Sequence, residues 1–241
     1  MTDSAGESLL RPLRGGNAFE ETVQRLLQMI RLGAVAPGER LPSERELAIR
    51  LGVSRDTLRD AIASLADAAY LVSRRGRYGG TFVADEVPAD AARLAHDHPR
   101  PAFTAEAIDD ALAVREVLEL GAVRLAAGRA LSAPERERLW QAFEESRAAE
   151  PADYRRLDSR LHLTIGELAG APSLVPLFAD ARMRVNGLLD DIPLLPRNIA
   201  HSDEQHARIV GAILTGQAEA AEAAMAEHLG GTAALLRGFL S

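Results

Sequence analysis

Four residues in the second half of the chain have side chains that bind transition metals. Asp158 and His162 lie four residues apart, so a helix would place them on one face, while His206 and His228 each lie within an apolar stretch. Three neutral imidazoles and one carboxylate suit Zn²⁺, Ni²⁺, Mn²⁺ or Fe²⁺, and they would leave open positions for a small molecule's carboxylate on a metal that prefers six ligands. A single histidine in an apolar stretch is more often a core residue than a ligand, so the spacing alone leaves both interpretations open.

Arginines in the first third of the chain have the chemistry of nucleic-acid recognition. Arg55 and Arg59 lie on adjacent turns of one expected helix, and Arg45 lies in the first turn of the helix before it. A guanidinium can bond guanine O6 and N7 together, or a phosphate, and each such base contact gives roughly 1–3 kcal/mol of discrimination. We include Thr57, on the same helix as Arg55, among the predicted DNA contacts. The alternative is an ordinary helical hairpin whose arginines are solvated.

Two short helices are expected to position these arginines. Ser43 and Glu46 have the spacing of a capping box, which predicts that one helix begins there, and Gly52 ends it. Ser54 caps a second helix, whose apolar residues recur at helical spacing. Two short helices joined by a glycine-containing turn form a helix-turn-helix, and the arginine-bearing start of the second helix enters the major groove.

A basic hairpin follows the two helices. Residues 70–72 and 81–83 are short strand-like runs, and the segment between them is rich in arginine and glycine. This pattern predicts a wing. Gly76 can bring the backbone close to DNA, and Arg75 and Arg77 supply charge that can follow a minor groove or its phosphates.

Changes in composition divide the chain into four segments. We predict a flexible arm at 1–16, a winged helix-turn-helix domain at 17–84, a proline-containing linker at 85–103 and a helical domain at 104–241. The linker could hold one short helix around residues 89–96.

The last segment is helical throughout and free of strand patterns. Six main helices are expected to begin near residues 104, 132, 150, 172, 197 and 216. They predict an all-α antiparallel bundle of six or seven helices, so the whole chain is expected to be mainly α. The first helix, expected to run to about residue 131, is apolar on more than one side, which places it in the centre of the bundle or against a second subunit.

Charge and composition agree with two domains of different roles. The chain has 241 residues and a net charge of −7, but residues 1–84 carry 12 arginines against 10 acidic residues, and residues 85–241 carry 16 against 25. The small basic surplus therefore coincides with the predicted DNA reader. The absence of cysteine excludes disulfides and thiolate metal sites. With neither a signal pattern nor an apolar run long enough to span a bilayer, we expect a cytoplasmic protein.

Both halves of the chain resemble known bacterial regulators. The region from Phe19 to Val83, including PGERLPSERELAIRLGVSRDTLRDAI and RRGRYGGTFV, resembles the winged-helix domain of GntR-family transcription regulators. The segments RLDSRLHLTIGELAGAPSLVPL and SDEQHARIVGAILTGQAEAAEAAMAEHL resemble the FCD ligand-binding domain of FadR-type members. The resemblance implies that Arg45, Arg55, Arg59 and Gly76 are DNA contacts.

The FCD resemblance also implies a metal site beside an effector pocket. Asp158, His162, His206 and His228 match the four positions that hold a divalent metal in many members. Gln205 departs from the family pattern, where a Glu often precedes the third ligand, and this would alter the hydrogen bonding around the site without removing a ligand.

Arg115 resembles a position that directs an arginine into the pocket, where it would pair with an effector carboxylate, although an interhelical salt bridge is the alternative. Asn186, with Arg182 and Arg184 on the same helix, could line that pocket, with at least one of the three facing solvent.

These features predict a metabolite-responsive repressor rather than an enzyme. We expect a homodimer that binds a palindromic operator and responds to a small organic acid, with no membrane partner. Two alternatives share the metal site. One is a metal-dependent enzyme acting on a small organic acid, with Asp203 or Glu204 as the base. The other is a regulator whose metal is purely structural. A third alternative is a helix-turn-helix without an operator.

Overall fold

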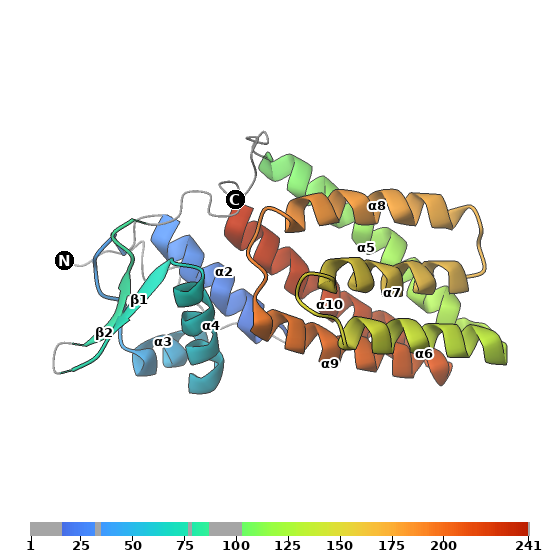
Figure 1. The fold of residues 1–241 in the computed structure, drawn as a ribbon, viewed down its shortest axis with the longest axis horizontal. Coiled ribbons are helices and arrows are strands. Elements are labelled where there is room, and N and C mark those ends of the chain that lie inside the picture. Colours follow the sequence, from blue (N-terminus) through green and yellow to red (C-terminus); the bar gives the residue numbers. More distant parts are fainter. Residues whose placement is uncertain (1–15, 32–34, 77–78, 87–102, 241) are drawn as a thin grey trace. The chain divides into compact units, whose positions relative to one another are not determined.

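The computed structural model of the protein describes residues 16–31, 35–76, 79–86 and 103–240. These residues form nine helices and a two-stranded antiparallel sheet, in the order α2-α3-α4-β1-β2-α5-α6-α7-α8-α9-α10 (Figure 1). The chain divides into two compact units. Unit 1 comprises the described residues before 102 together with Asp191–Asn198 and the end of α10 from Gly231, and unit 2 comprises Phe103–Asp190 and Ile199–Gly230.

Unit 1 contains the predicted helix-turn-helix. Helix α2 (Ala18–Arg31) packs against α4 (Arg55–Asp67), and α3 (Glu44–Leu51) packs against α4. The predicted caps are present, because Ser43 Oγ accepts the Glu46 N–H at 3.3 Å and Ser54 Oγ accepts the Thr57 N–H at 2.9 Å. Gly52 ends α3 with φ 68°, a left-handed conformation that costs glycine little.

The wing consists of β1 (Leu71–Arg74) and β2 (Gly80–Val83), which pair antiparallel with Leu71 opposite Val83. The segment before α3 adds to this sheet as predicted, through a bridge between Arg40 and Phe82. Both strands lie within one residue of the expected runs, since alternating apolar residues and flanking glycines define a hairpin locally.

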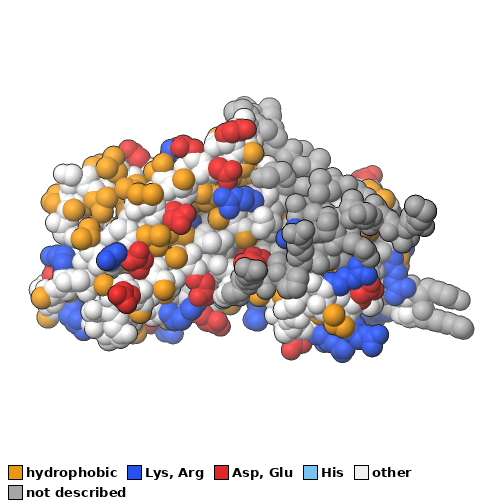
Figure 2. Space-filling view, turned by 180° about the vertical axis from the view of Figure 1, so that it is seen from behind, with side chains coloured by type: hydrophobic (Ala, Val, Ile, Leu, Met, Phe, Trp, Pro, Cys, Tyr) orange, Lys and Arg blue, Asp and Glu red, His pale blue; other side chains and the backbone are white. Residues whose placement is uncertain are grey.

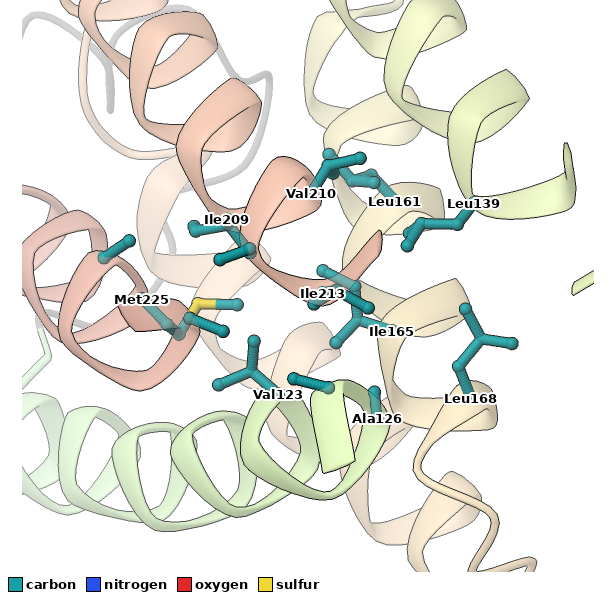
Figure 3. Packing of buried hydrophobic residues seen from close by; sticks show 14 of the residues in the cluster. Val123, Ala126, Leu139, Leu161, Ile165, Leu168, Ile209, Val210, Ile213 and Met225 are labelled. Carbon is teal, nitrogen blue, oxygen red and sulfur yellow. The ribbon is translucent and has the colours of Figure 1, made fainter. Parts of the chain in front are cut away.

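Unit 2 is a bundle built from α5 (Ala105–Gly128), α6 (Ala133–Arg147), α7 (Tyr154–Leu168), α8 (Leu174–Leu189), α9 (Pro196–Leu214) and α10 (Ala218–Leu240). Helix α7 lies between α6 and α8 and packs against α5 (Figure 1). The largest buried cluster joins residues of five helices, including Val123, Leu139, Ile165, Ile213 and Met225 (Figure 3). The six main helices of the predicted bundle are therefore present in the described residues.

Two of the predicted helix bounds are wrong. Helix α5 ends at Gly128 rather than near residue 131, and Arg129 is extended with ψ 148°. The Arg129 guanidinium donates to the Leu168 carbonyl at the end of α7, and Ser132 caps α6, so the intervening residues must leave the helix. Helix α7 begins at Tyr154 rather than at 150–151, because a turn with an Asp153 N–H to Glu150 carbonyl bond precedes it.

Helices α9 and α10 each contribute residues to both units. Within unit 1, Asn198 of α9 donates to Glu20 Oε1 at 2.9 Å, and Phe239 of α10 packs edge-on against Tyr70 with 5.8 Å between ring centroids. A side chain at Gly238 would lie 3.0 Å from the Gln24 Cα, so α10 approaches α2 closely there.

Some expectations lie outside the described residues. They are most of the arm at 1–16, the possible helix at 89–96 with most of its linker, and Arg77 of the wing. Among the helices that are described, none combines the length and apolarity needed to cross a bilayer.

Candidate functional site

The four predicted metal ligands converge in the interior of unit 2. Helix α7 supplies Asp158 and His162, α9 supplies His206 and α10 supplies His228. One potential ligand atom from each residue lies within 4.8 Å of the others, and all four residues are between 0% and 8% exposed. The three imidazole rings contact one another, with centroids 4.5–5.3 Å apart. Helix packing thus brings together donors that are up to 70 residues apart in the sequence, from Asp158 to His228.

The hydrogen bonding of the histidines fits a divalent cation. His162 Nε2 and both ring nitrogens of His206 are buried with no hydrogen-bond partner among the described residues. Asp158 Oδ1 lies 3.4 Å from His206 Nε2 and 3.7 Å from His162 Nε2. Unsatisfied buried polar groups are costly, and a metal that accepts these lone pairs would remove the cost. The residues present therefore fit the metal that the sequence predicts.

Two neighbouring side chains orient the imidazoles. Glu119 of α5 accepts a hydrogen bond from His162 Nδ1 at 2.5 Å, and the Gln205 side-chain oxygen accepts one from His228 Nδ1 at 3.1 Å. A proton held on Nδ1 leaves Nε2 as the lone-pair donor, so both contacts select the tautomer that a metal requires. Gln205, the departure from the family pattern, thus acts on the fourth ligand rather than on its neighbour His206.

Two arginines and two carboxylates surround the cluster in balanced numbers. Arg115 Nε lies 2.9 Å from Glu119 Oε1, and Arg182 bonds Asp158 and lies 3.4 Å from Glu119. Burial alone would raise the pKa of Asp158, but Arg182 and the three histidines outweigh it and hold that pKa below its ordinary value. Burial likewise opposes ionisation of Glu119, and Arg115 with His162 outweighs it, so the pKa of Glu119 is also lowered.

The predicted effector residues lie beside this network. Arg115 is buried and pairs with Glu119 of its own helix, so the alternative of an interhelical salt bridge is wrong, and its Nη1 has no hydrogen-bond partner. Asn186 donates to Ser159 Oγ at 2.8 Å, which leaves its buried Oδ1 without a partner. Of the two arginines on the same helix, Arg182 is buried and Arg184 is exposed and paired with Asp110.

Burial also changes the proton affinity of the histidines and of one acid. It lowers the pKa of His206 to about 3, and the pKa of His228 falls well below its ordinary value through burial and the adjacent His206. Asp203, one turn before His206, has a pKa raised to about 6 by partial burial and by Asp158. At neutral pH the cluster therefore presents neutral His206 and His228 imidazoles and an ionised Asp158.

A second candidate site lies in unit 1, between the helix-turn-helix and the wing. An open cavity of about 490 Å³ is lined by the starts of α3 and α4 and by both strands. Arginine side chains gather over unit 1 in Figure 2. The charged residues that line the cavity are Arg40, Arg45, Arg55, Arg59, Arg74 and Glu44. Five cations against one anion produce a positive surface that suits a phosphate backbone.

The predicted DNA contacts differ in how they are held. Arg45 and Arg55 are exposed, while Arg59 Nε lies 2.8 Å from Glu44 Oε2. The Thr57 hydroxyl lies 2.7 Å from Ser54 Oγ and so contributes to the helix cap, with capacity left for a phosphate. Arg75 and Gly76 are exposed on the wing, where Gly76 has φ 104°.

Four residues of these sites were not predicted from the sequence. Glu119 lies one turn after Arg115, and that spacing alone could have suggested an ion pair. Arg40 and Glu44 flank the first capping residue and face the cavity, and no spacing signal distinguishes them from other exposed charges. The contact of Gln205 with His228 depends on the packing of α9 against α10.

Comparison with known proteins identifies both halves of the chain. Residues 19–83 match the family model described as bacterial regulatory proteins, gntR family, and residues 110–231 match the FCD domain. A putative L-lactate dehydrogenase operon regulatory protein of Escherichia coli K12 is 31% identical over 225 residues, covering 87% of this chain and 83% of that protein.

Two further relatives agree with this assignment. The HTH-type transcriptional repressor NanR of Cronobacter sakazakii is 30% identical over 239 residues, covering 95% of this chain and 89% of that protein. The solved structure of E. coli McbR/YncC has the same fold, with a TM-score of 0.51 and 20% identity, covering 93% of this chain and 98% of that one.

Replacing the carboxylate that orients His162 should weaken metal binding. Glu119→Gln keeps the shape of the side chain but removes a charged acceptor, and loss of such an outer contact lowers metal affinity about 10- to 100-fold. Isothermal titration of the apoprotein with Zn²⁺ or Ni²⁺ measures the change. Glu167→Gln, which changes an exposed carboxylate of α7, is the control and should bind metal as the unmodified protein does. Equal affinities for all three proteins would contradict the role given to Glu119.

Acid should destabilise the metal-free protein. Below pH 6.5 the unfolded chain protonates His206, whereas the folded chain does so only near pH 3. The unfolded state thus binds more protons in this range, and the free energy of unfolding must fall as pH falls. Asp203 has the opposite effect between its ordinary pKa of 3.8 and about 6. The lowered pKa values of His228 and Glu119 add to that of His206, so the net effect is loss of stability.

Urea unfolding of the chelator-treated protein between pH 8 and pH 4 measures this dependence. His206→Gln removes one titrating group and should flatten the decline, while His201→Gln, a substitution outside the cluster, should leave it unchanged. A free energy of unfolding that does not change with pH would show that the buried histidines are not neutral in the folded chain.

Proposed function

This chain belongs to the GntR family of bacterial regulators and carries an FCD domain, and we propose that it is a homodimeric, FadR-type repressor controlled by a metal-bound carboxylate. The family and the named relatives are transcription regulators, so the chain is a DNA-binding regulator and not an enzyme. Its place of action is proposed to be the cytoplasm, where operator DNA is found.

The observation that carries the metal and effector proposal is the charge balance of the buried site. Arg115 and Arg182 offset Glu119 and Asp158, and His206 and His228 are neutral. A divalent cation held by Asp158 and the three histidines would add two buried positive charges. Uncompensated buried charge is expensive, so a bound metal creates a requirement for an anion at the same place.

Unused hydrogen-bonding groups beside the cluster indicate the chemistry of that anion. Arg115 Nη1 is a buried donor without a partner, and Asn186 Oδ1 is a buried acceptor without one. A carboxylate can take the arginine hydrogen, and a hydroxyl group can donate to the amide oxygen. We therefore propose a small hydroxycarboxylate as the effector. The relative named for an L-lactate dehydrogenase operon is in keeping with this class.

The continuity of two helices supports a link between the effector site and DNA binding. Helix α9 carries His206 and also Asn198, which bonds Glu20 within unit 1, and α10 carries His228 and also Phe239, which contacts Tyr70 within unit 1. A ligand that shifts either histidine acts on a helix that ends in the DNA-binding unit. An effector that changes operator affinity 100-fold needs a differential affinity of about 2.7 kcal/mol between the two states.

Removing the arginines of the recognition helix should abolish specific DNA binding. Arg55→Ala and Arg59→Ala should each weaken binding to a duplex selected from a random library by the unmodified protein. The expected loss is about 1–3 kcal/mol for a base contact, or a roughly uniform loss with a smaller salt dependence for a phosphate contact. Arg156→Ala, an exposed arginine of α7 paired with Asp153, is the matched control.

Electrophoretic mobility shift against scrambled competitor at several salt concentrations distinguishes these cases. Affinities within twofold for all three variants would mean that the helix-turn-helix has a structural role only. A palindrome among the selected duplexes would support the dimeric proposal, and asymmetric half-length sites would oppose it.

The effector should stabilise the protein only when the metal is present. A ligand at 100 times its dissociation constant adds roughly 2.7 kcal/mol to the free energy of unfolding, which thermal unfolding detects. Lactate and glycolate should act more strongly than pyruvate, which lacks the hydroxyl group, and a chelator should abolish the effect. Arg115→Lys keeps the charge but loses the planar fork, so it should weaken the effect of the acid, while Arg156→Lys should not.

Two outcomes would separate the alternatives. If no carboxylate stabilises the metal-loaded protein, and if chelation unfolds unit 2, the metal is structural. If carboxylates stabilise the chelated protein equally well, the arginines bind the effector without a metal.

A further inference from the structure

One face of α5 exposes apolar side chains that the bundle does not cover. The described residues expose seven large hydrophobic side chains, and four of them lie on the adjacent helices α5 and α8. Val117 is 73% exposed and Leu125 is 51% exposed on α5, and Leu177 and Met183 are 56% and 71% exposed on α8. Figure 2 views the protein from the side on which α5 lies, and hydrophobic side chains gather there over the helical unit.

Small residues make this face of α5 accessible to another helix. Ala113, Gly121 and Gly128 are exposed and recur at helical spacing with Val117. A Cβ atom built at Gly121 or at Gly128 would meet nothing within 4 Å, so the two glycines serve no packing purpose among the described residues. Glycine in a helix interior costs roughly 0.5–1 kcal/mol relative to alanine. A close approach of a second backbone would give this cost a purpose.

The order of residues along this face is complementary to itself in the antiparallel direction. Glu116 and Arg124 are exposed and lie four residues on either side of Leu120. Val117 and Leu125 lie four residues on either side of Gly121. When two copies of α5 cross antiparallel near these central residues, Glu116 of each copy meets Arg124 of the other, and Val117 meets Leu125.

A parallel crossing would instead place like charges together. Arg124 is free to take part, since its side chain is 67% exposed and its Nη1 lies 3.5 Å from Glu222, a long and exposed ion pair.

We infer that this face of α5, flanked by Leu177 and Met183 of α8, is the interface through which two copies of the chain form a two-fold dimer. A two-fold interface must be complementary to itself, which the charge and size pattern provides. The 24 residues of α5 extend about 36 Å, long enough for a contact of standard size, roughly 1,600 Å² in total. The inference rests on the proposed homodimer and names the surface that it uses.

A cysteine crosslink tests the interface directly, because the chain contains no cysteine. Gly121→Cys would place two thiols near the two-fold axis, and mild oxidation should convert most of the protein to a covalent dimer. Gly211→Cys, on the exposed face of α9, is the matched control, because a side chain there also meets nothing within 4 Å. The control should remain uncrosslinked at the same protein concentration.

A charge exchange tests the predicted direction. Sedimentation velocity of Glu116→Arg and of Arg124→Glu should show dimer dissociation constants raised at least about 10-fold, since like charges then face each other. The double variant restores opposite charges and should recover most of the affinity. Gly121→Arg should dissociate the dimer without lowering the thermal unfolding temperature of the protein by more than Gly211→Arg does.

The outcomes distinguish this inference from the proposal on which it rests. An unmodified protein that sediments as a monomer at micromolar concentrations overturns the homodimer itself. An unmodified dimer that survives Gly121→Arg, and whose Gly121→Cys variant does not crosslink, overturns only the α5 interface and leaves the dimer to another surface.

Discussion

Charge burial in the centre of unit 2 is the constraint on which the rest of the site depends. Two arginines, two carboxylates and three histidines occupy positions from which water is excluded, and such a set is tolerated only when charges are paired and hydrogen-bonded. Arg182 and Arg115 keep Asp158 and Glu119 ionised against the effect of burial, while burial keeps His206 neutral. A neutral imidazole and an ionised carboxylate are the forms in which these groups bind a metal. The packing that makes the site costly is thus also what prepares it.

Glu119 has a central position in this network. Its two oxygens contact His162, Arg115 and Arg182, which lie on three different helices. One side chain therefore links the orientation of a metal ligand to the two cations that would meet an anionic effector. A change in the charge near either arginine would reach His162 through a single residue.

The two sites use arginine in opposite ways. In unit 1, Arg45 and Arg55 are exposed, and Arg59 is held at the cavity edge by Glu44, so these cations keep their hydration until a phosphate or base replaces it. In unit 2, Arg115 and Arg182 are already dehydrated and gain strength from the low polarity around them. Weakly held arginines suit a reversible contact with a long polyanion, while buried arginines suit selective binding of one small anion.

The elements of both units could be predicted from the sequence, because caps, turn glycines and apolar periodicity act within a few residues. Ser43, Ser54 and Gly52 defined the helix-turn-helix, and the i,i+4 pair of Asp158 and His162 marked one face of α7. Resemblance to a family, rather than spacing, joined His206 and His228 to that pair.

Only the tertiary structure decided which side chains meet across helices. It placed Glu119 on His162, 43 residues away, Gln205 on His228, and Arg115 on Glu119 rather than on another helix. The physical reason is that local periodicity specifies which face of a helix is buried but not which neighbour it meets or at what height. Helix packing sets those two quantities, and the charges of the site depend on both.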